Sequence, residues 1–170
     1  MRLIHWPFIW LLISTLHCSF LLAKESEKKH GEHKRDSGVI KPDQSLDFLK
    51  KGNRRFFQAH LSNAGIGKKD REKLVSGQKP HAIILTCSDS RVPPEIVFDQ
   101  KLGEIFVVRT AGQSLGASAI ASIEYAVSHL GSNLIVVMGH ESCGAVKAAL
   151  ETLKGGDAGS LWLNQLVKDL

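Results

Sequence analysis

The stretch AIILTCSDSR, residues 82–91, joins an apolar segment to a group of reactive side chains. Residues 82–86 form a short run rich in β-branched side chains, which is typical of a strand buried on both faces of a sheet. Cys87 follows this run directly, and Asp89 and Arg91 come two and four residues later. The stretch therefore predicts a buried strand that ends in a chemically active loop.

Two further apolar runs, 105–108 and 134–138, have the same character. Between them, residues 116–130 carry apolar side chains at helical spacing, and similar patterns occupy 143–154 and the segment from Ser160 to the end. Buried strands that alternate with helices predict an α/β fold. We expect a parallel β-sheet core flanked by helices on both faces.

A helical pattern also precedes the strands. It begins near Ser45, with Asp43 or Ser45 available to cap it. A second, short helix is expected around 69–76, ended by Gly77. The residues expected on one face of the first helix are Leu46, Leu49, Asn53, Phe56 or Phe57, and His60.

The composition of the chain is that of an ordinary globular protein. Its 170 residues suffice for one domain with a hydrophobic core. A net charge of +5 is modest, and we expect no nucleic-acid partner. Three cysteines are an odd number and too few for a disulfide scaffold. The function must therefore be argued from particular residues.

The sequence before the folded domain divides into two parts. Residues 1–23 carry a basic residue, Arg2, near their start and are largely apolar, which predicts a signal peptide and export to the periplasm or out of the cell. The run is also about long enough to cross a bilayer, and Cys18 leaves a lipid-attached form open, so membrane anchoring through this segment is the alternative. Residues 24–42 are mostly polar and predict a flexible spacer. We expect the domain itself at 43–170.

Metal-ligating side chains follow two of the predicted strands. Cys87 comes directly after the first strand, and His140 and Cys143 come after the third. If the first strand lies between the other two, these residues meet outside the carboxyl ends of the strands, where parallel α/β sheets bind ligands. Thiolate and imidazole are the ligands that zinc prefers, and three of them leave a position open. The pattern predicts a zinc site.

Other interpretations of these residues stay open at this point. Cys87 and Cys143 could form a disulfide in an exported protein, or each could be a small buried side chain without chemistry. A His-x-x-Cys motif alone is a weak signal. The glycines within 112–116 could form an anion-binding turn at a helix start, although close packing explains them as well.

Asp89 and Arg91 make the zinc interpretation more specific. Asp89 lies two residues beyond a candidate ligand, so its carboxylate could reach the metal or accept a hydrogen bond from a water there. Arg91 can hold that carboxylate in a forked pair, which keeps it ionised and off the metal. An ordinary surface ion pair is the alternative.

Several separated segments now resemble one family. They look like the characteristic segments of β-class carbonic anhydrases, in that family's order and spacing, from about Leu46 to the end of the chain. The segments are CSDSRV (87–92), GEIFVVRTAG (103–112), SIEYAV (122–127) and VVMGHESCGAV (136–146), with GNRRF (52–56) and GQKP (77–80) in support.

The resemblance implies an activity and a metal centre. The family reversibly hydrates carbon dioxide to bicarbonate and a proton. Cys87, His140 and Cys143 match its zinc ligands, with one Zn²⁺ per chain. Asp89 matches an aspartate that either binds zinc as the fourth ligand or pairs with Arg91 in the active form. Zinc lowers the pKa of bound water to about 7, which suits this reaction.

The resemblance also implies substrate contacts and partners. Gln78 matches a glutamine that helps to orient the substrate. Phe106 and Tyr125 match aromatic residues that line the carbon dioxide pocket, partly across a subunit boundary. The family forms tight dimers, so we expect a homodimer or a higher homo-oligomer.

The chain departs from the family at its C-terminal end. Family members usually continue well past the last motif, whereas this chain stops at Leu170 inside a helical pattern. We therefore expect a C-terminally truncated form of the fold. The alternative to an active enzyme is a truncated, catalytically inactive zinc-binding domain.

Overall fold

A computed structural model describes residues 40–62 and 64–170 of the chain. The predicted signal peptide at 1–23, Cys18 and residues 24–39 of the predicted spacer lie outside this part. Among the described residues, no helix has the length and apolar character needed to cross a membrane.

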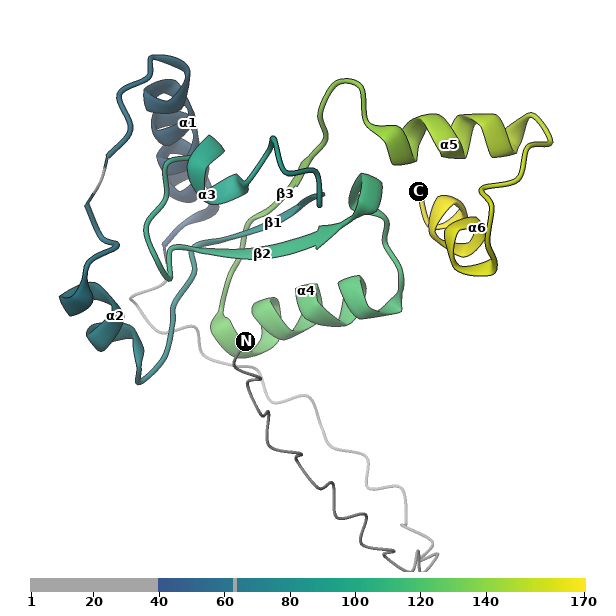
Figure 1. The fold of residues 1–170 in the computed structure, drawn as a ribbon. Coiled ribbons are helices and arrows are strands. Elements are labelled where there is room, and N and C mark those ends of the chain that lie inside the picture. The colour runs from purple at the N-terminus through teal and green to yellow at the C-terminus, as the bar shows by residue number, and fades with distance from the viewer. Residues whose placement is uncertain (1–39, 63) are drawn as a thin grey trace, which may run out of the picture. The chain divides into compact units, whose positions relative to one another are not determined.

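The described residues fold into a small α/β arrangement (Figure 1). Two short helices, α3 (Pro94–Val97) and η1 (Ala111–Gln113), are not predicted by the sequence, whereas the other elements are, with small differences at their ends. The elements are α1 (Pro42–Phe57), α2 (Lys68–Leu74), β1 (Ala82–Cys87), α3 (Pro94–Val97), β2 (Ile105–Thr110), η1 (Ala111–Gln113), α4 (Ala117–Leu130), β3 (Ile135–Met138), α5 (Gly144–Leu153) and α6 (Leu161–Lys168).

The three strands form one parallel sheet in the order β2-β1-β3. Cys87 at the end of β1 lies opposite Thr110 on β2, and Thr86 lies opposite Met138 on β3. The predicted parallel sheet is confirmed, with the first strand in its centre. All six residues of β1 are buried, as the continuous apolar run predicts.

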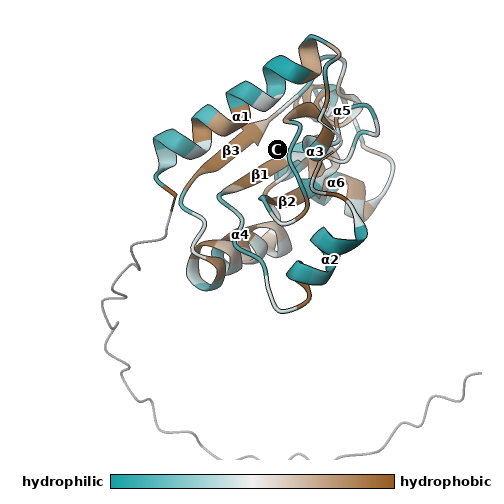
Figure 2. Ribbon diagram, turned by 90° about the vertical axis from the view of Figure 1, so that its left-hand side faces the viewer, coloured by the Kyte–Doolittle hydropathy of each residue, from teal (hydrophilic) through white to brown (hydrophobic). Residues whose placement is uncertain are grey.

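Helices cover both faces of the central strand. Helix α4 packs on one face, whereas α1 and the α3 segment lie on the other (Figure 1). The hydropathy colours show the strands as the most apolar layer between them (Figure 2). The core on the α4 side contains Ile83, Leu85, Val108, Ala119 and Ala126. The core on the α1 side contains Leu49, Ala82, Ile84 and Ile105.

The outer strand β3 is less buried than predicted. Val136 and Met138 pack against the core on the α1 side, but Ile135 and Val137 on the opposite face are 49% and 63% exposed. The buried core beneath α4 is formed with residues of β1 and β2, so this face of β3 stays open. The expectation of a strand buried on both faces is therefore wrong for β3.

Helix α1 begins earlier than predicted, and the predicted caps are wrong. Pro42 occupies its first turn, where a missing N–H costs nothing, and the Gln44 side chain accepts a hydrogen bond from the Lys41 N–H at 3.3 Å. Ser45 lies inside the helix and is buried. Its Oγ lies 2.8 Å from the carbonyl oxygen of His81 and 2.6 Å from Nδ1 of the same residue, which ties α1 to the start of β1.

The buried face of α1 consists of Ser45, Leu49 and Gly52. Of the predicted face only Leu49 is buried, and Phe57 is 87% exposed. Gly52 explains the difference. A Cβ at this position would lie 1.7 Å from the carbonyl oxygen of Phe98, so the helix approaches the backbone after α3 as closely as a glycine allows.

We predict that Gly52→Ala destabilises the domain by about 2 kcal/mol or more, because the added methyl group overlaps backbone that cannot move freely. Helix propensity alone would give the opposite sign, since alanine is favoured over glycine by about 1 kcal/mol. Thermal or urea unfolding measures the change. Gly144→Ala in α5 is the matched control, because its Cβ would meet no atom within 4 Å. A Gly52→Ala chain that is more stable than wild type would contradict the close approach.

Candidate metal centre

The candidate metal centre lies at the carboxyl edge of the sheet. Cys87 is the last residue of β1, and His140 follows β3 by two residues. Cys143 is the N-cap residue of α5, which starts immediately after it. Because the strands are parallel, their carboxyl ends meet at one edge, and residues far apart in the sequence come together there.

The side chains of Cys87, His140 and Cys143 form a compact donor set. One ligand atom from each lies within 4.8 Å of the others, and the two Sγ atoms are 3.9 Å apart. Both cysteines are free, so the alternative of a disulfide is not supported. Two sulfurs bound to one tetrahedral zinc at about 2.3 Å would lie about 3.8 Å apart, which is close to the separation found here.

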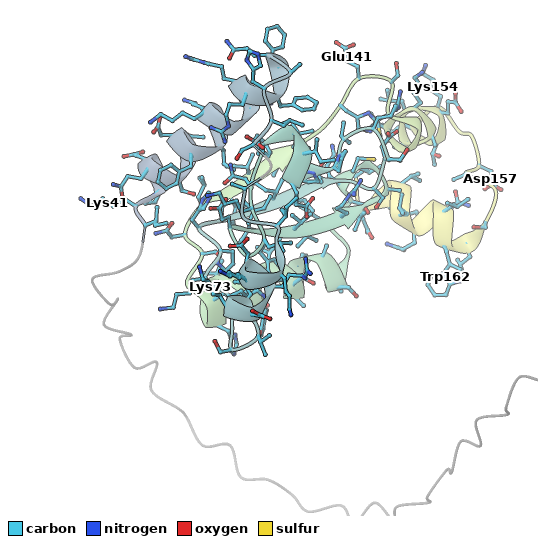
Figure 3. The ribbon with its side chains drawn as sticks, turned by 60° about the vertical axis from the view of Figure 1, so that its left-hand side comes forward. Lys41, Lys73, Glu141, Lys154, Asp157 and Trp162 are labelled. Carbon is cyan, nitrogen blue, oxygen red and sulfur yellow. The ribbon has the colours of Figure 1, made fainter. Side chains whose placement is uncertain are left out.

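His140 is oriented as a metal ligand requires. Its Nδ1 lies 2.9 Å from the carbonyl oxygen of Glu141, which places the ring proton on Nδ1. Its Nε2 is buried without a hydrogen-bond partner and carries the free lone pair. The Glu141 side chain itself points outward from the loop (Figure 3). The orphaned Nε2 beside two thiols is the observation that fits a soft divalent ion such as zinc.

The environment of Cys87 favours the thiolate. Burial alone raises the pKa of this thiol, but hydrogen bonding, chiefly from the Gly112 N–H, outweighs it and lowers the pKa to about 7. The Gly112 nitrogen lies 3.3 Å from Sγ. The neighbouring Cys87 sulfur, in turn, raises the pKa of His140. A metal ion would therefore compete with protons at both of these ligands.

Asp89 and Arg91 form the predicted forked pair. Nε and Nη2 of Arg91 donate to the two carboxylate oxygens at 2.9 and 2.8 Å, and the Arg91 N–H donates to Oδ1 at 2.9 Å. These hydrogen bonds hold the pKa of Asp89 well below its usual range. Oδ2 of Asp89 lies 3.8 Å from Nε2 of His140. The carboxylate is thus ionised beside the donor set, and its role as a fourth ligand stays a prediction.

The predicted substrate residues lie elsewhere in this chain. Gln78 is exposed in the loop before β1, at the end of the strand opposite to Cys87. Phe106 precedes Thr110 by four residues on β2, which is about 13 Å along a strand. Tyr125 on α4 faces Phe106 with a ring separation of 6.3 Å. The structure brings Phe106 and Tyr125 together but not to the donor set, and their contact with substrate stays a prediction.

Comparisons with known proteins agree with this arrangement. A family model described as carbonic anhydrase matches residues 82–169. The solved β-carbonic anhydrase CcaA is 32% identical, with a TM-score of 0.55 over 73% of this chain and 61% of its own. The chain belongs to the β-carbonic anhydrase family. The β-carbonic anhydrase of Coccomyxa, solved with acetazolamide, is 30% identical, with a TM-score of 0.52 over 73% of this chain and 55% of its own.

Two bacterial family members are more similar in sequence. Carbonic anhydrase 2 of Mycobacterium tuberculosis is 51% identical over 108 residues, which cover 64% of this chain and 52% of the relative. Carbonic anhydrase of Mycolicibacterium smegmatis is 47% identical over 120 residues, which cover 71% of this chain and 58% of the relative. The chain thus spans about half the length of these relatives.

Two residues at the centre were not identified from the sequence. Gly112 donates its N–H to the Cys87 sulfur, and Arg109 donates to the carbonyl oxygens of Cys87 and Asp89. Both belong to the segment 103–112, which the resemblance highlights without giving these residues a role. Every residue carries backbone donors and acceptors, so residue type does not predict which of them form these hydrogen bonds.

We predict that purified chain holds one zinc ion and that Cys143→Ser loses it, because a serine hydroxyl replaces one of two thiolate ligands. Atomic emission after exhaustive dialysis measures the metal content. Cys18→Ser is the matched control and should keep the zinc. Stoichiometric zinc in Cys143→Ser would show that the ion sits elsewhere.

We also predict that zinc affinity falls as the pH drops below about 7. Lower pH protonates the thiol of Cys87, whose pKa is about 7, and protonates His140, whose pKa is raised, so protons compete with the ion at both ligands. Competition with a chromophoric chelator at several pH values measures this dependence. An affinity that is constant between pH 8 and pH 6 would contradict a site made of these ligands.

Proposed function

We propose that this chain catalyses the zinc-dependent, reversible hydration of carbon dioxide to bicarbonate and a proton. The observation that carries the proposal is the placement of the donor set beside the tethered carboxylate. Ligand atoms of Cys87, His140 and Cys143 lie within 4.8 Å of one another, and Asp89 in its pair with Arg91 reaches within 3.8 Å of His140. Membership of the β-carbonic anhydrase family supports the same reaction.

Different residues of the chain have different roles in this reaction. Zinc, when bound by the donor set, supplies the Lewis acidity that makes water acidic near neutral pH. Arg91 keeps Asp89 ionised and fixes its two oxygens by a forked pair. Asp89 can then accept a hydrogen bond from the reacting water and direct it toward carbon dioxide. Such an oriented acceptor next to the ligands is what the reaction needs from the protein.

A second candidate function is a zinc-binding domain without turnover. It is supported by the distance between the donor set and the residues expected to contact substrate, Gln78, Phe106 and Tyr125. Carbon dioxide is small and apolar, so an active site needs an apolar pocket at the metal. In this proposal the chain binds zinc but lacks that pocket.

Assembly into a homodimer or a higher homo-oligomer would supply the missing surroundings, and we propose it as part of the function. Three apolar side chains of α4 are nearly half exposed: Ile120 at 46%, Tyr125 at 48% and Val127 at 47%. Exposed apolar side chains of this number favour burial against another chain. A second copy is the partner that the family resemblance suggests.

Export from the cytoplasm is a further proposal and rests on the sequence of residues 1–23. Retention of that segment as a membrane anchor is its alternative. In either case zinc would protect the two thiolates from oxidation outside the cytoplasm.

We predict that the full chain accelerates carbon dioxide hydration in stopped-flow assays and that Asp89→Ala lowers the rate at least about tenfold, because the reacting water loses its oriented acceptor. Cys143→Ser should abolish the activity together with the zinc. Ser90→Ala, an exposed neighbour in the same loop, is the control and should keep the wild-type rate. A zinc-loaded wild type no faster than Asp89→Ala would favour the inactive zinc-binding domain.

A further inference from the structure

The guanidinium of Arg109 on β2 binds the backbone of the loop that carries Cys87 and Asp89. Its Nε donates to the carbonyl oxygen of Cys87 at 3.2 Å, and its Nη2 donates to the carbonyl oxygen of Asp89 at 2.7 Å. Arg109 lies opposite Thr86 in the sheet register, so its side chain extends past the end of β1. One side chain thus binds the backbone of both the candidate ligand Cys87 and Asp89.

These contacts lie at the point where backbone hydrogen bonding between this segment and β2 ends. The last backbone hydrogen bond from this segment to β2 is donated by Ser88 to Thr110, at 2.9 Å. At Asp89 the chain turns, and the Val92 N–H donates to the Asp89 carbonyl oxygen at 3.2 Å within the turn. Among the described residues, Arg109 is the group that connects the Asp89 backbone to the neighbouring strand.

The position of the Asp89 backbone affects where the carboxylate of the centre lies. Its side chain carries the carboxylate that pairs with Arg91 and approaches His140 to 3.8 Å. A small rotation of this peptide would move the carboxylate relative to the ligand atoms of Cys87 and His140.

We propose that Arg109 is a positioning residue of the metal centre, which fixes Cys87 and Asp89 relative to each other through their carbonyl oxygens. The inference rests on the proposed zinc site and adds to it a residue that touches neither the donor atoms nor the Asp89 carboxylate. Arginine suits the role because its planar fork presents two donors in a fixed geometry. A lysine at the same position has the charge but only a single ammonium group.

The test compares Arg109→Lys with Arg71→Lys in the full chain. Arg71 on α2 also donates to a backbone carbonyl, that of Ile66 at 3.0 Å, so the control removes the same type of hydrogen bond away from the centre. Zinc affinity is measured by chelator competition, and the ligand geometry is read from the thiolate-to-metal absorption of the cobalt(II)-loaded chain. Circular dichroism confirms that each variant is folded.

We expect Arg109→Lys to weaken zinc binding about tenfold to a hundredfold and to change the cobalt spectrum, because residues behind the ligands contribute on this scale. Arg71→Lys should change neither. Free guanidinium at millimolar concentration should restore the spectrum of Arg109→Ala, an effect that a general loss of stability would not show. Arg109→Gln serves as a second variant, and the same loss of zinc affinity is expected there.

An Arg109→Lys chain that binds zinc as tightly as wild type and gives the same cobalt spectrum would overturn the inference. A wild-type chain that takes up neither metal would overturn the proposed function and the inference together. A wild-type chain that binds metal but does not hydrate carbon dioxide would contradict the proposed function alone. The inference about Arg109 is then still decided by the metal binding of the Arg109 variants.

Discussion

The parallel pairing of β1 with both β2 and β3 determines where every reactive side chain of this domain lies. β1 is buried along its whole length, so its register with both neighbours is fixed by the cores on its two faces. A shift by one residue would turn Cys87 to the opposite face of the sheet. The same pairing brings the loop after β3 beside the end of β1, and with it His140 and Cys143.

Around this edge the backbone adopts left-handed conformations. Gly112 has a φ of 67°, and Gln113 and Ser142 have φ values of 54° and 57° although they carry side chains. Such conformations cost about 1 kcal/mol or more at non-glycine residues and persist where surrounding contacts hold them. Ser142 lies between His140 and Cys143, so its conformation helps both ligands to face the same point. Glycine is favoured at position 112 because φ is positive there and a Cβ would lie 2.8 Å from the Leu170 side chain and 3.0 Å from that of Ala145.

The central strand and the donor set are predictable from sequence because they depend on residue type. A continuous apolar run gives β1, and a cysteine or histidine after a strand gives a ligand. The buried face of α1 is not predictable in the same way, because Ser45 and Gly52 are buried through a hydrogen bond and a close approach to backbone from another element. The role of Arg109 is hidden for a related reason, since its acceptors are carbonyl oxygens that every residue carries. The open face of β3 was missed because apolar sequence alone does not tell whether a helix covers it.

X-ray absorption at the zinc edge of the purified chain tests the central claim most directly, because it reports the atoms bound to the ion. A centre made of Cys87, His140 and Cys143 predicts two sulfur atoms at about 2.3 Å, with the remaining nitrogen and oxygen ligands at about 2.0 Å. A first shell made only of nitrogen and oxygen, or a single sulfur, would show that the two thiols do not share one ion and would contradict the account.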